Sequence, residues 1–253
     1  METRAFDIGM IAQVLPQLLT YLDVTLLVGF VSIALGSLLG GALAWANLSG
    51  AAPLRWAAVS YVYVMRCTPS IVLLFIVFYG LPKLAFALFD YDMNALHRAV
   101  FAIITFTLLF GAYISEVFRA AYKAVPRGQY EAAVSAGLTP FQAFRHVMLS
   151  QAAIVALPNF GNATINLLKE GSLAYTIGLI DLIGKGNLII AQNFGAYGIE
   201  VYLAALLIYW VLVLLLEQVF ALVEKRLDFG TSLRAADTKE ATGRGGDAVG
   251  AGS

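Results

Sequence analysis

The chain has 253 residues, of which 60% are hydrophobic and 13% are charged, and its formal net charge is zero. Soluble domains carry about 25% charged residues, so this composition favours an integral membrane protein, and the neutral balance gives no basic signature for nucleic acid. The single cysteine excludes an intrachain disulfide and a multi-cysteine metal site. Two histidines, His97 and His146, lie too far apart to suggest a zinc motif, so no metal is expected.

Residues 1–20 are predicted to form an N-terminal extracytoplasmic or interfacial segment. The sequence begins with polar residues without the cleavage pattern of a signal peptide. Residues 8–21 are then apolar with a mild helical stripe, which is typical of a helix in the membrane interface.

A membrane-crossing helix needs about 20 apolar residues. Five segments meet this length and predict a transmembrane domain over residues 21–227, with spans at about 24–46, 57–81, 99–118, 147–168 and 200–223. In the first span, Gly36 and Gly40 form a pair of small residues four apart, which predicts close packing against another helix.

Two other segments do not fit a span. Residues 175–194 mix glycine, Asp181 and Lys185 with apolar residues, which indicates a partly buried re-entrant or interfacial segment. Residues 228–253 are rich in glycine, alanine, threonine and charge, with no apolar period, so a disordered cytoplasmic tail is expected.

Orientation follows from the basic residues of the short loops, because cytoplasmic loops carry an excess of Lys and Arg. The residues concerned are Arg119, Lys123, Arg127 and Arg145 between the third and fourth spans, and Lys225 and Arg226 after the fifth. Both regions are therefore predicted to be cytoplasmic. Five spans then place the N-terminus outside and the C-terminus in the cytoplasm.

The cytoplasmic loop 127–145 has its own predicted structure. A helical piece over 127–136 ends at Gly137, and Thr139 followed by a proline is a good N-cap for a new helix. Ala132 and Ala133 would let another backbone approach closely, with the charge of Glu131 at the rim. This pattern favours a docking surface for another protein.

Two ionised groups lie within the spans, where each costs at least about 2.5–3.5 kcal/mol on insertion scales. Arg66 lies in the second span, where Pro69 should break the helix, and Glu116 lies in the third. The two side chains could pair to hold the bundle together or could line a substrate path, and both interpretations stay open.

The fourth span carries Asn159, Asn162, Asn166 and Lys169 at steps of three and four residues, which places them on one helical face. Such a stripe faces a pore, a substrate or a partner helix, and hydrogen bonding between helices is the structural alternative. For a zwitterionic amino acid, Glu116 could bind the ammonium group, and either Arg66 or Lys169 could bind the carboxylate.

Four short motifs, in order, resemble those of ABC-transporter permeases of the polar amino-acid uptake group, over roughly residues 21–226. They are R-G-T-P, present as Arg66-Cys67-Thr68-Pro69; A-Y-x-x-E-x-x-R, present as Ala112-Tyr113, Glu116 and Arg119; G-Q-x-E-A-A, present as Gly128-Gln129 and Glu131-Ala132-Ala133; and K-x-T-S-L, present as Lys169, Gly171, Ser172 and Leu173. The third belongs to the EAA loop, whose glycine is Gly137. This chain departs from the family pattern at Cys67, at Gly171, and where Leu149-Ser150 replaces Leu-Pro.

The resemblance implies an all-α fold, a type I, MetI-like bundle of five transmembrane helices with a cytoplasmic coupling helix, in a bacterial cytoplasmic (inner) membrane. It implies four partners: a cytoplasmic ABC ATPase dimer, a second permease protomer (the same chain or a different one), an extracytoplasmic solute-binding protein, and membrane lipid. The ATPase-coupling residues would be Arg127, Gln129, Glu131, Ala132, Ala133 and Gly137. The substrate pathway would include Arg66, Thr68, Glu116, Asn159, Asn162, Asn166 and Lys169.

This chain lacks the glycine-rich loop that binds ATP, since Gly184-Lys185 has neither the upstream glycine at the right distance nor a following Ser or Thr. ATP and magnesium would therefore be bound by the partner ATPase, and the chain is expected to hold no cofactor and to be no enzyme. The predicted function is the permease of an ATP-driven importer of polar amino acids or close derivatives. An ion-coupled secondary amino-acid transporter is the alternative, although it should show paired halves or several acids along one path. A membrane enzyme ranks third, since no nucleophile–base pair is evident.

Overall fold

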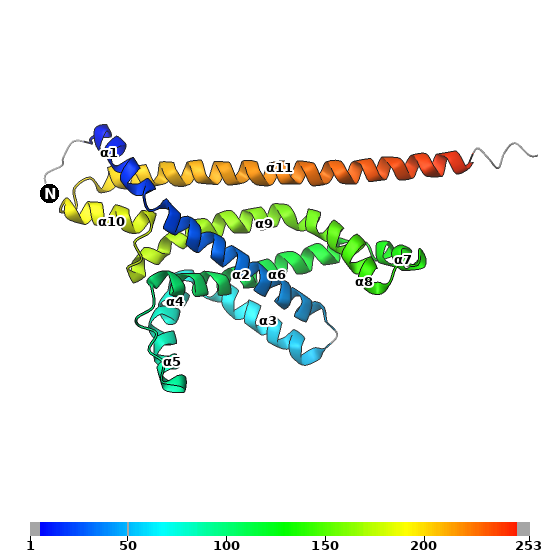
Figure 1. Cartoon of the computed structure of the whole chain (residues 1–253), viewed down its shortest axis with the longest axis horizontal. Coiled ribbons are helices and arrows are strands. Elements are labelled where there is room, and N and C mark those ends of the chain that lie inside the picture. The colour runs from blue at the N-terminus through cyan, green and yellow to red at the C-terminus, as the bar shows by residue number, and fades with distance from the viewer. Residues whose placement is uncertain (1–5, 50, 247–253) are drawn as a thin grey trace, which may run out of the picture.

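The computed structural model describes residues 6–49 and 51–246, with side chains described up to residue 227. Every element of regular structure in these ranges is helical, which confirms the predicted all-α class. The helices are α1 (Ile8–Leu19), α2 (Leu22–Leu48), α3 (Ala52–Cys67), α4 (Ser70–Phe75), the π-helix η1 (Ile76–Gly80), α5 (Leu81–Phe89), α6 (Arg98–Ala124), α7 (Arg127–Ser135), α8 (Pro140–Ala143), the π-helix η2 (Phe144–Met148), α9 (Leu149–Gly171), the 3-10 helix η3 (Ser172–Ile177), α10 (Leu182–Gln192) and α11 (Gly198–Gly246). Figure 1 shows α7 and α8 at one end of the molecule, with α1 and α10 at the other.

Helices α2 and α6 pack closely along glycines, as the small residues of the first span predict. A β-carbon added at Gly40 would lie 2.9 Å from the carbonyl oxygen of Gly111 on α6. One added at Gly36 would lie 2.9 Å from the Phe110 ring. No larger residue fits at Gly40 unless the two helices move apart.

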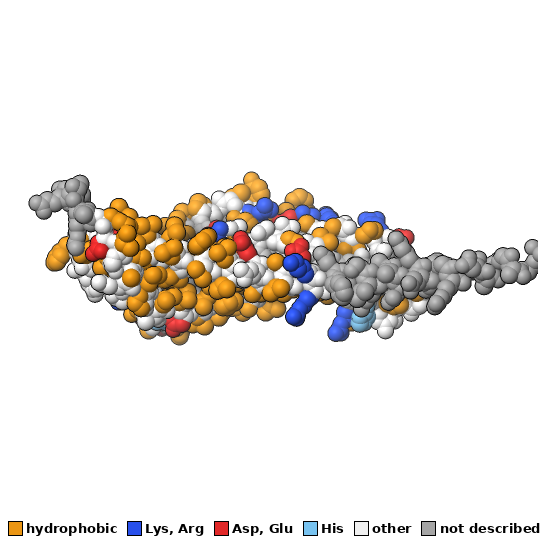
Figure 2. All heavy atoms as spheres, turned by 90° about the horizontal axis from the view of Figure 1, so that it is seen from above, with side chains coloured by type: hydrophobic (Ala, Val, Ile, Leu, Met, Phe, Trp, Pro, Cys, Tyr) orange, Lys and Arg blue, Asp and Glu red, His pale blue; other side chains and the backbone are white. Residues whose placement is uncertain are grey.

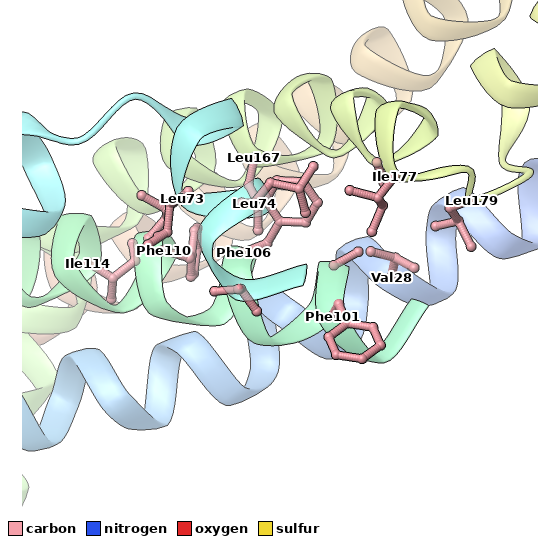
Figure 3. Close-up of a cluster of buried hydrophobic side chains, with 14 residues drawn as sticks. Val28, Leu73, Leu74, Phe101, Phe106, Phe110, Ile114, Leu167, Ile177 and Leu179 are labelled. Atoms are coloured by element: carbon pink, nitrogen blue, oxygen red, sulfur yellow. The ribbon is translucent and has the colours of Figure 1, made fainter. Parts of the chain in front are cut away.

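The main hydrophobic core lies where α2, α4, α6, α9 and η3 meet, and Figure 3 shows its buried side chains. Phe101, Phe106 and Phe110 of α6 are each at most 2% exposed and form its centre. Leu74 of α4 and Leu167 of α9 pack against the same cluster. This core therefore fixes the position of α9 relative to the rest of the bundle.

A second cluster joins the N-terminus to the last helix. Val14 and Leu18 of α1 are fully buried with Leu182 of α10 and Val201 of α11. Residues 8–21 thus contribute a helix, α1, that packs on α10 and α11. α10 itself follows η3 at a bend of 45°.

By length and composition, four described helices could cross a membrane: Leu22–Leu48, Ser70–Phe89, Arg98–Ala124 and Gly198–Leu227. The bent pair Pro140–Ile177 and Leu182–Gln192 would make a fifth. The prediction of one span over 57–81 is wrong in its bounds. Thr68 and Pro69 are extended, with ψ angles of 125° and 134°, and separate α3 from α4. A proline has no N–H to donate and restricts the residue before it, so the helix ends there.

The disordered tail predicted from residue 228 is also corrected, because α11 continues to Gly246. Residues 231–242 are rich in Ala, Leu, Arg, Lys and Glu, which have high intrinsic helix propensity. The last part of the predicted tail, 247–253, lies outside the described residues.

Asp181 begins α10 and is only 2% exposed. Its Oδ1 accepts a hydrogen bond of 2.7 Å from the Gly184 amide, and its Oδ2 has no hydrogen-bond partner among the described residues. We expect Asp181→Ala to lower the free energy of unfolding by about 1–2 kcal/mol through loss of the cap. Asp181→Asn keeps an oxygen for the amide and removes the buried charge, so it should be at least as stable as the wild type. Thermal unfolding in detergent checks both, and an equal loss in the two variants would contradict the capping role.

Candidate functional site

The segment between α6 and α9 folds as two short helices joined by a tight turn. Gly137 has φ = 92°, in the left-handed region that favours glycine. The Gly137 amide donates to the Val134 carbonyl at 3.0 Å, and the Leu138 amide donates to the Ala133 carbonyl at 3.2 Å. This pair of bonds is a Schellman motif, which ends α7.

The start of the second short helix is confirmed in detail. Thr139 and Gln142 form a reciprocal capping box: the Gln142 amide donates to Thr139 Oγ1 at 3.3 Å, and the Thr139 amide donates to Gln142 Oε1 at 2.9 Å. Gln151 Nε2 of α9 also donates to Gln129 Oε1 of α7, at 3.3 Å. The turn is thus held by specific bonds at both ends.

Five of the six predicted coupling residues are exposed on this segment: Arg127, Gln129, Glu131, Ala132 and Gly137. The sixth is the exception, because Ala133 is only 8% exposed and is buried within the permease. Ala133 is therefore a packing residue and does not contribute to the outer surface of α7. Two further apolar side chains, Val134 and Phe141, are exposed on this segment and were not predicted. Phe141 could have been predicted, because it is a large aromatic residue in an otherwise polar loop.

On α9 the whole polar stripe lies on an open face. Asn159, Asn162, Asn166 and Lys169 are all exposed, which agrees with their shared side of the helix. The opposite face is buried through Ala156, Gly161, Thr164, Ile165, Leu167 and Leu168. The stripe therefore makes no part of the interior of this chain.

The break at Thr68 and Pro69 lies beside the end of the stripe. Ser70, the first residue of α4, donates from its hydroxyl to Oε2 of Glu170 at 3.1 Å. Glu170 follows Lys169 directly, so this bond joins the two motifs, which are about 100 residues apart in sequence. Thr68 itself donates from Oγ1 to the Val64 carbonyl at 2.8 Å. Neither Ser70 nor Glu170 was predicted.

The two ionised groups of the spans are not paired with each other. Glu116 forms an ion pair of 2.6 Å with Arg119, one turn further along α6. Arg66 instead places its guanidinium 6.0 Å from the centre of the Tyr113 ring, in the range of a cation–π contact. In this structure the ion pair of Glu116 is thus formed with Arg119 and not with Arg66.

Lys169 also borders a cavity of 560 Å³ between the end of α9, the start of α10 and the first half of α11. Ser172 and the rings of Tyr209 and Trp210 line the same cavity. A basic group, a hydroxyl and aromatic faces thus meet at one end of the stripe. Among the described side chains, no group of three or more His, Cys, Asp and Glu residues is arranged to hold a metal ion.

The bundle of long apolar helices, with a polar face on one span and a pair of short helices at one end, is what is expected of a membrane transport subunit. The chain belongs to the family of binding-protein-dependent transport system inner-membrane components, whose model matches residues 32–229. It is 38% identical to the L-cystine transport system permease protein TcyL of Bacillus subtilis, over 88% of this chain and 92% of that one. It is 30% identical to the nopaline transport system permease protein NocM of Agrobacterium fabrum, over 92% and 99%.

Solved structures agree. A crystal structure of an amino acid ABC transporter with histidines superposes with a TM-score of 0.76 at 29% identity, covering 88% of this chain and all of that one. An inward-facing MetNI methionine ABC transporter shares the fold, with a TM-score of 0.66 at 22% identity. The chain is the non-catalytic permease of an amino-acid ABC importer, a multi-pass inner-membrane protein whose family implies an ATPase and a binding protein as partners. The ion-coupled secondary transporter is thereby set aside.

Proposed function

We propose that this permease carries polar amino acids or close derivatives, and that it works as one of two permease protomers driven by a separate ATPase dimer. The proposal is supported by the relatives, whose names specify cystine, arginine and nopaline transport. ATP and magnesium belong to the ATPase. The N-terminus lies outside and the C-terminus in the cytoplasm, on the argument of the basic loops.

The exposed surface of α7 and α8 is the part that docks the ATPase. Arg127, Gln129, Glu131 and Ala132 face away from the bundle, and the turn at Gly137 is fixed by hydrogen bonds on both sides. Because these hydrogen bonds hold the turn in one conformation, a movement of the bound ATPase would be transmitted through α7 and α8 to α6 and α9. Figure 2 shows the Lys and Arg side chains gathered toward this end of the molecule, as a cytoplasmic end requires.

The observation that carries the solute path is the open polar face of α9. Polar side chains in a membrane helix normally face a bundle interior or a water-filled cavity, because exposure to lipid is costly. Within this chain, the side chains exposed on that face, Asn159, Asn162 and Asn166, do not face the interior of the bundle. A second protomer across this face would cover them and leave a polar path between the two chains.

Several groups of the proposed path meet at one of its ends. The ammonium group of Lys169, beside its cavity, is placed to bind the carboxylate of an amino acid. The break at Thr68 and Pro69 brings backbone groups to the same end, through the bond between Ser70 and Glu170. We assign Arg66 of α3 and Glu116 of α6 to the same path, and the ion pair with Arg119 offsets the charge of Glu116.

We expect Asn162→Leu to lower ATP-dependent uptake by about tenfold, the effect of losing one hydrogen bond to a polar solute. The measurement is uptake of labelled cystine, arginine and glutamine into proteoliposomes that hold the permease, its ATPase and its binding protein. Asn162→Gln, which keeps the amide, serves as the matched control and should retain most of the activity.

Uptake by the Asn162→Leu complex at the wild-type rate would remove the α9 face from the path. Uptake by the wild type that survives loss of ATP would contradict the proposed function as a whole. Assembly with the ATPase is measured in parallel, so that a folding defect is not read as a transport defect.

A further inference from the structure

A cavity of 1080 Å³ opens beside the start of α6, at the end of that helix opposite to α7 and α8. The start of α2, the helices η1 and α5, the loop from α5 to α6 and the turn before α10 border it. None of the described residues that line it belongs to α9, so the cavity is separate from the polar face of that helix. Pockets of about 300–1,000 Å³ hold drug-sized molecules, so this cavity is large enough for an amino acid.

Charged groups of both signs line this cavity. Lys83 of α5, Asp92 of the loop and Arg98 of α6 are all lining residues with exposed side chains. In the part of the chain with described side chains, the ion pair found within 4.0 Å is that of Arg119 with Glu116, so Asp92 pairs with neither cation of the cavity. Unpaired charges of opposite sign in one cavity are complementary to a ligand that carries both charges.

The guanidinium of Arg98 is held in position by the backbone of the turn before α10. Its Nη1 donates to the Gly178 carbonyl at 3.0 Å. Gly178 has φ = 79°, and a β-carbon added there would lie 3.2 Å from the guanidinium carbon, so only a glycine lets the cation lie against this turn. An arginine has five N–H donors, and this is the one hydrogen bond that Arg98 forms with the described residues. Its remaining donors, with the ammonium group of Lys83, can therefore bind a carboxylate.

Aromatic side chains form one wall of the cavity, which we define by Phe78, Tyr79 and Phe86. The ring of Phe78 meets that of Tyr79 edge to face, with 5.0 Å between centres, and that of Phe101 in the same way at 5.3 Å. Phe101 is only 2% exposed and belongs to the main core, so the wall is fixed to the bundle. Tyr79 and Phe86 are 61% and 60% exposed and offer their faces to the side chain of a ligand.

We infer that this cavity is an outer binding site for a dipolar amino acid. Lys83 and Arg98 bind its carboxylate, Asp92 binds its ammonium group, and its side chain lies along the aromatic wall. The inference rests on the proposed function, because the cavity lies on the outer side only where α7 and α8 are cytoplasmic. A solute that enters from outside would then occupy this site before it reaches the face of α9.

Equilibrium dialysis of the assembled permease–ATPase complex in phosphatidylglycerol nanodiscs, without binding protein, tests this inference. Labelled cystine, arginine and glutamine are each measured, whether or not the complex takes them up. The background is Cys67→Ser/Asn162→Leu, in which no permease thiol exchanges with cystine and the face of α9 is weakened. At least one of the three amino acids should bind in this background.

Two charge variants then locate the bound amino acid. Lys83→Gln and Asp92→Asn should each raise its dissociation constant about tenfold or more, because each removes a hydrogen bond to a charged group. Arg98 is left intact because it also holds the turn at Gly178. Asp90→Asn makes the same change of charge two residues before Asp92, on a residue that does not line the cavity, and as the matched control should leave binding unchanged.

Four results would overturn the inference. None of the three amino acids could bind in the background, or binding could be insensitive to both charge variants. An effect of Lys83→Gln without one of Asp92→Asn would show a site for a plain anion. Loss of binding when phosphatidylethanolamine is added to the nanodiscs would show that a lipid headgroup, which carries the same two charges, is the occupant. Each of these results leaves ATP-dependent uptake by the wild type intact, whereas loss of that uptake alone contradicts the proposed function.

Discussion

Gly40→Leu is expected to abolish assembly of the transporter, and with it all uptake. At this position α2 and α6 approach so closely that an added β-carbon would lie 2.9 Å from the Gly111 carbonyl oxygen and 3.1 Å from the Ser115 amide nitrogen. Both neighbours are backbone atoms and cannot turn aside. Forcing extra methylene groups into such a contact costs about 1–3 kcal/mol or more, since the helices must separate. The core beneath this contact, around Phe110 and Ile114, would lose its packing as well.

The adjacent glycine provides the matched control. Gly41→Ala adds its β-carbon where no atom lies within 4 Å, so it should leave assembly intact or raise stability by about 0.5–1 kcal/mol through helix propensity. Gly40→Ala, with the same chemical change, should lower the melting temperature in detergent. Equal effects of the two alanines on thermal unfolding would show that α2 and α6 do not pack through Gly40.

The second large effect is expected at the coupling surface. Ala132 is exposed on α7, so Ala132→Trp should leave the fold of the permease unchanged while preventing close approach of the ATPase. Interface positions of this kind cost at least about 2 kcal/mol when disrupted, which is roughly a 30-fold loss of affinity. Copurification of the ATPase and ATP-dependent uptake should both be lost. Ala132→Ser keeps the small size and should retain both.

The neighbouring alanine separates docking from folding. Ala133 is only 8% exposed, so Ala133→Trp should unfold or displace α7 and lower the yield of intact permease. A well-folded Ala132→Trp permease that binds the ATPase as the wild type does would refute the assignment of this surface. The assignment would also be refuted if Ala132→Trp, like Ala133→Trp, lost ATPase binding only because the permease no longer folds.

Hydropathy located most of the bundle because crossing a membrane imposes a length that sequence alone reveals. Helices α2, α6 and α11 contain the predicted spans, and the turn at Gly137 with its Thr139 cap could be predicted from local backbone chemistry. The second span could not. The mean hydropathy of the segment does not reveal the break at Thr68 and Pro69, where extended backbone separates α3 from α4.

Side-chain partners were the part of the site that sequence could not supply. Periodicity placed the three asparagines on one face of α9, but only packing shows that this face is open. The pairing of Glu116 with Arg119 was within reach of the sequence, because residues three apart on a helix are neighbours. The bond between Ser70 and Glu170, which are about 100 residues apart in sequence, was not. Such contacts depend on how helices settle against the aromatic core, which no local pattern encodes.

The most direct test of the account is the side of the membrane on which α7 lies. Cys67 is the single cysteine of the chain, so Ala132→Cys in a Cys67→Ser background gives one reporter thiol on the coupling surface. A membrane-impermeant maleimide should label this thiol in inverted vesicles stripped of ATPase and leave it unlabelled in intact cells. Labelling from the outside of intact cells would contradict the account, because no cytoplasmic ATPase could then reach the surface that drives transport.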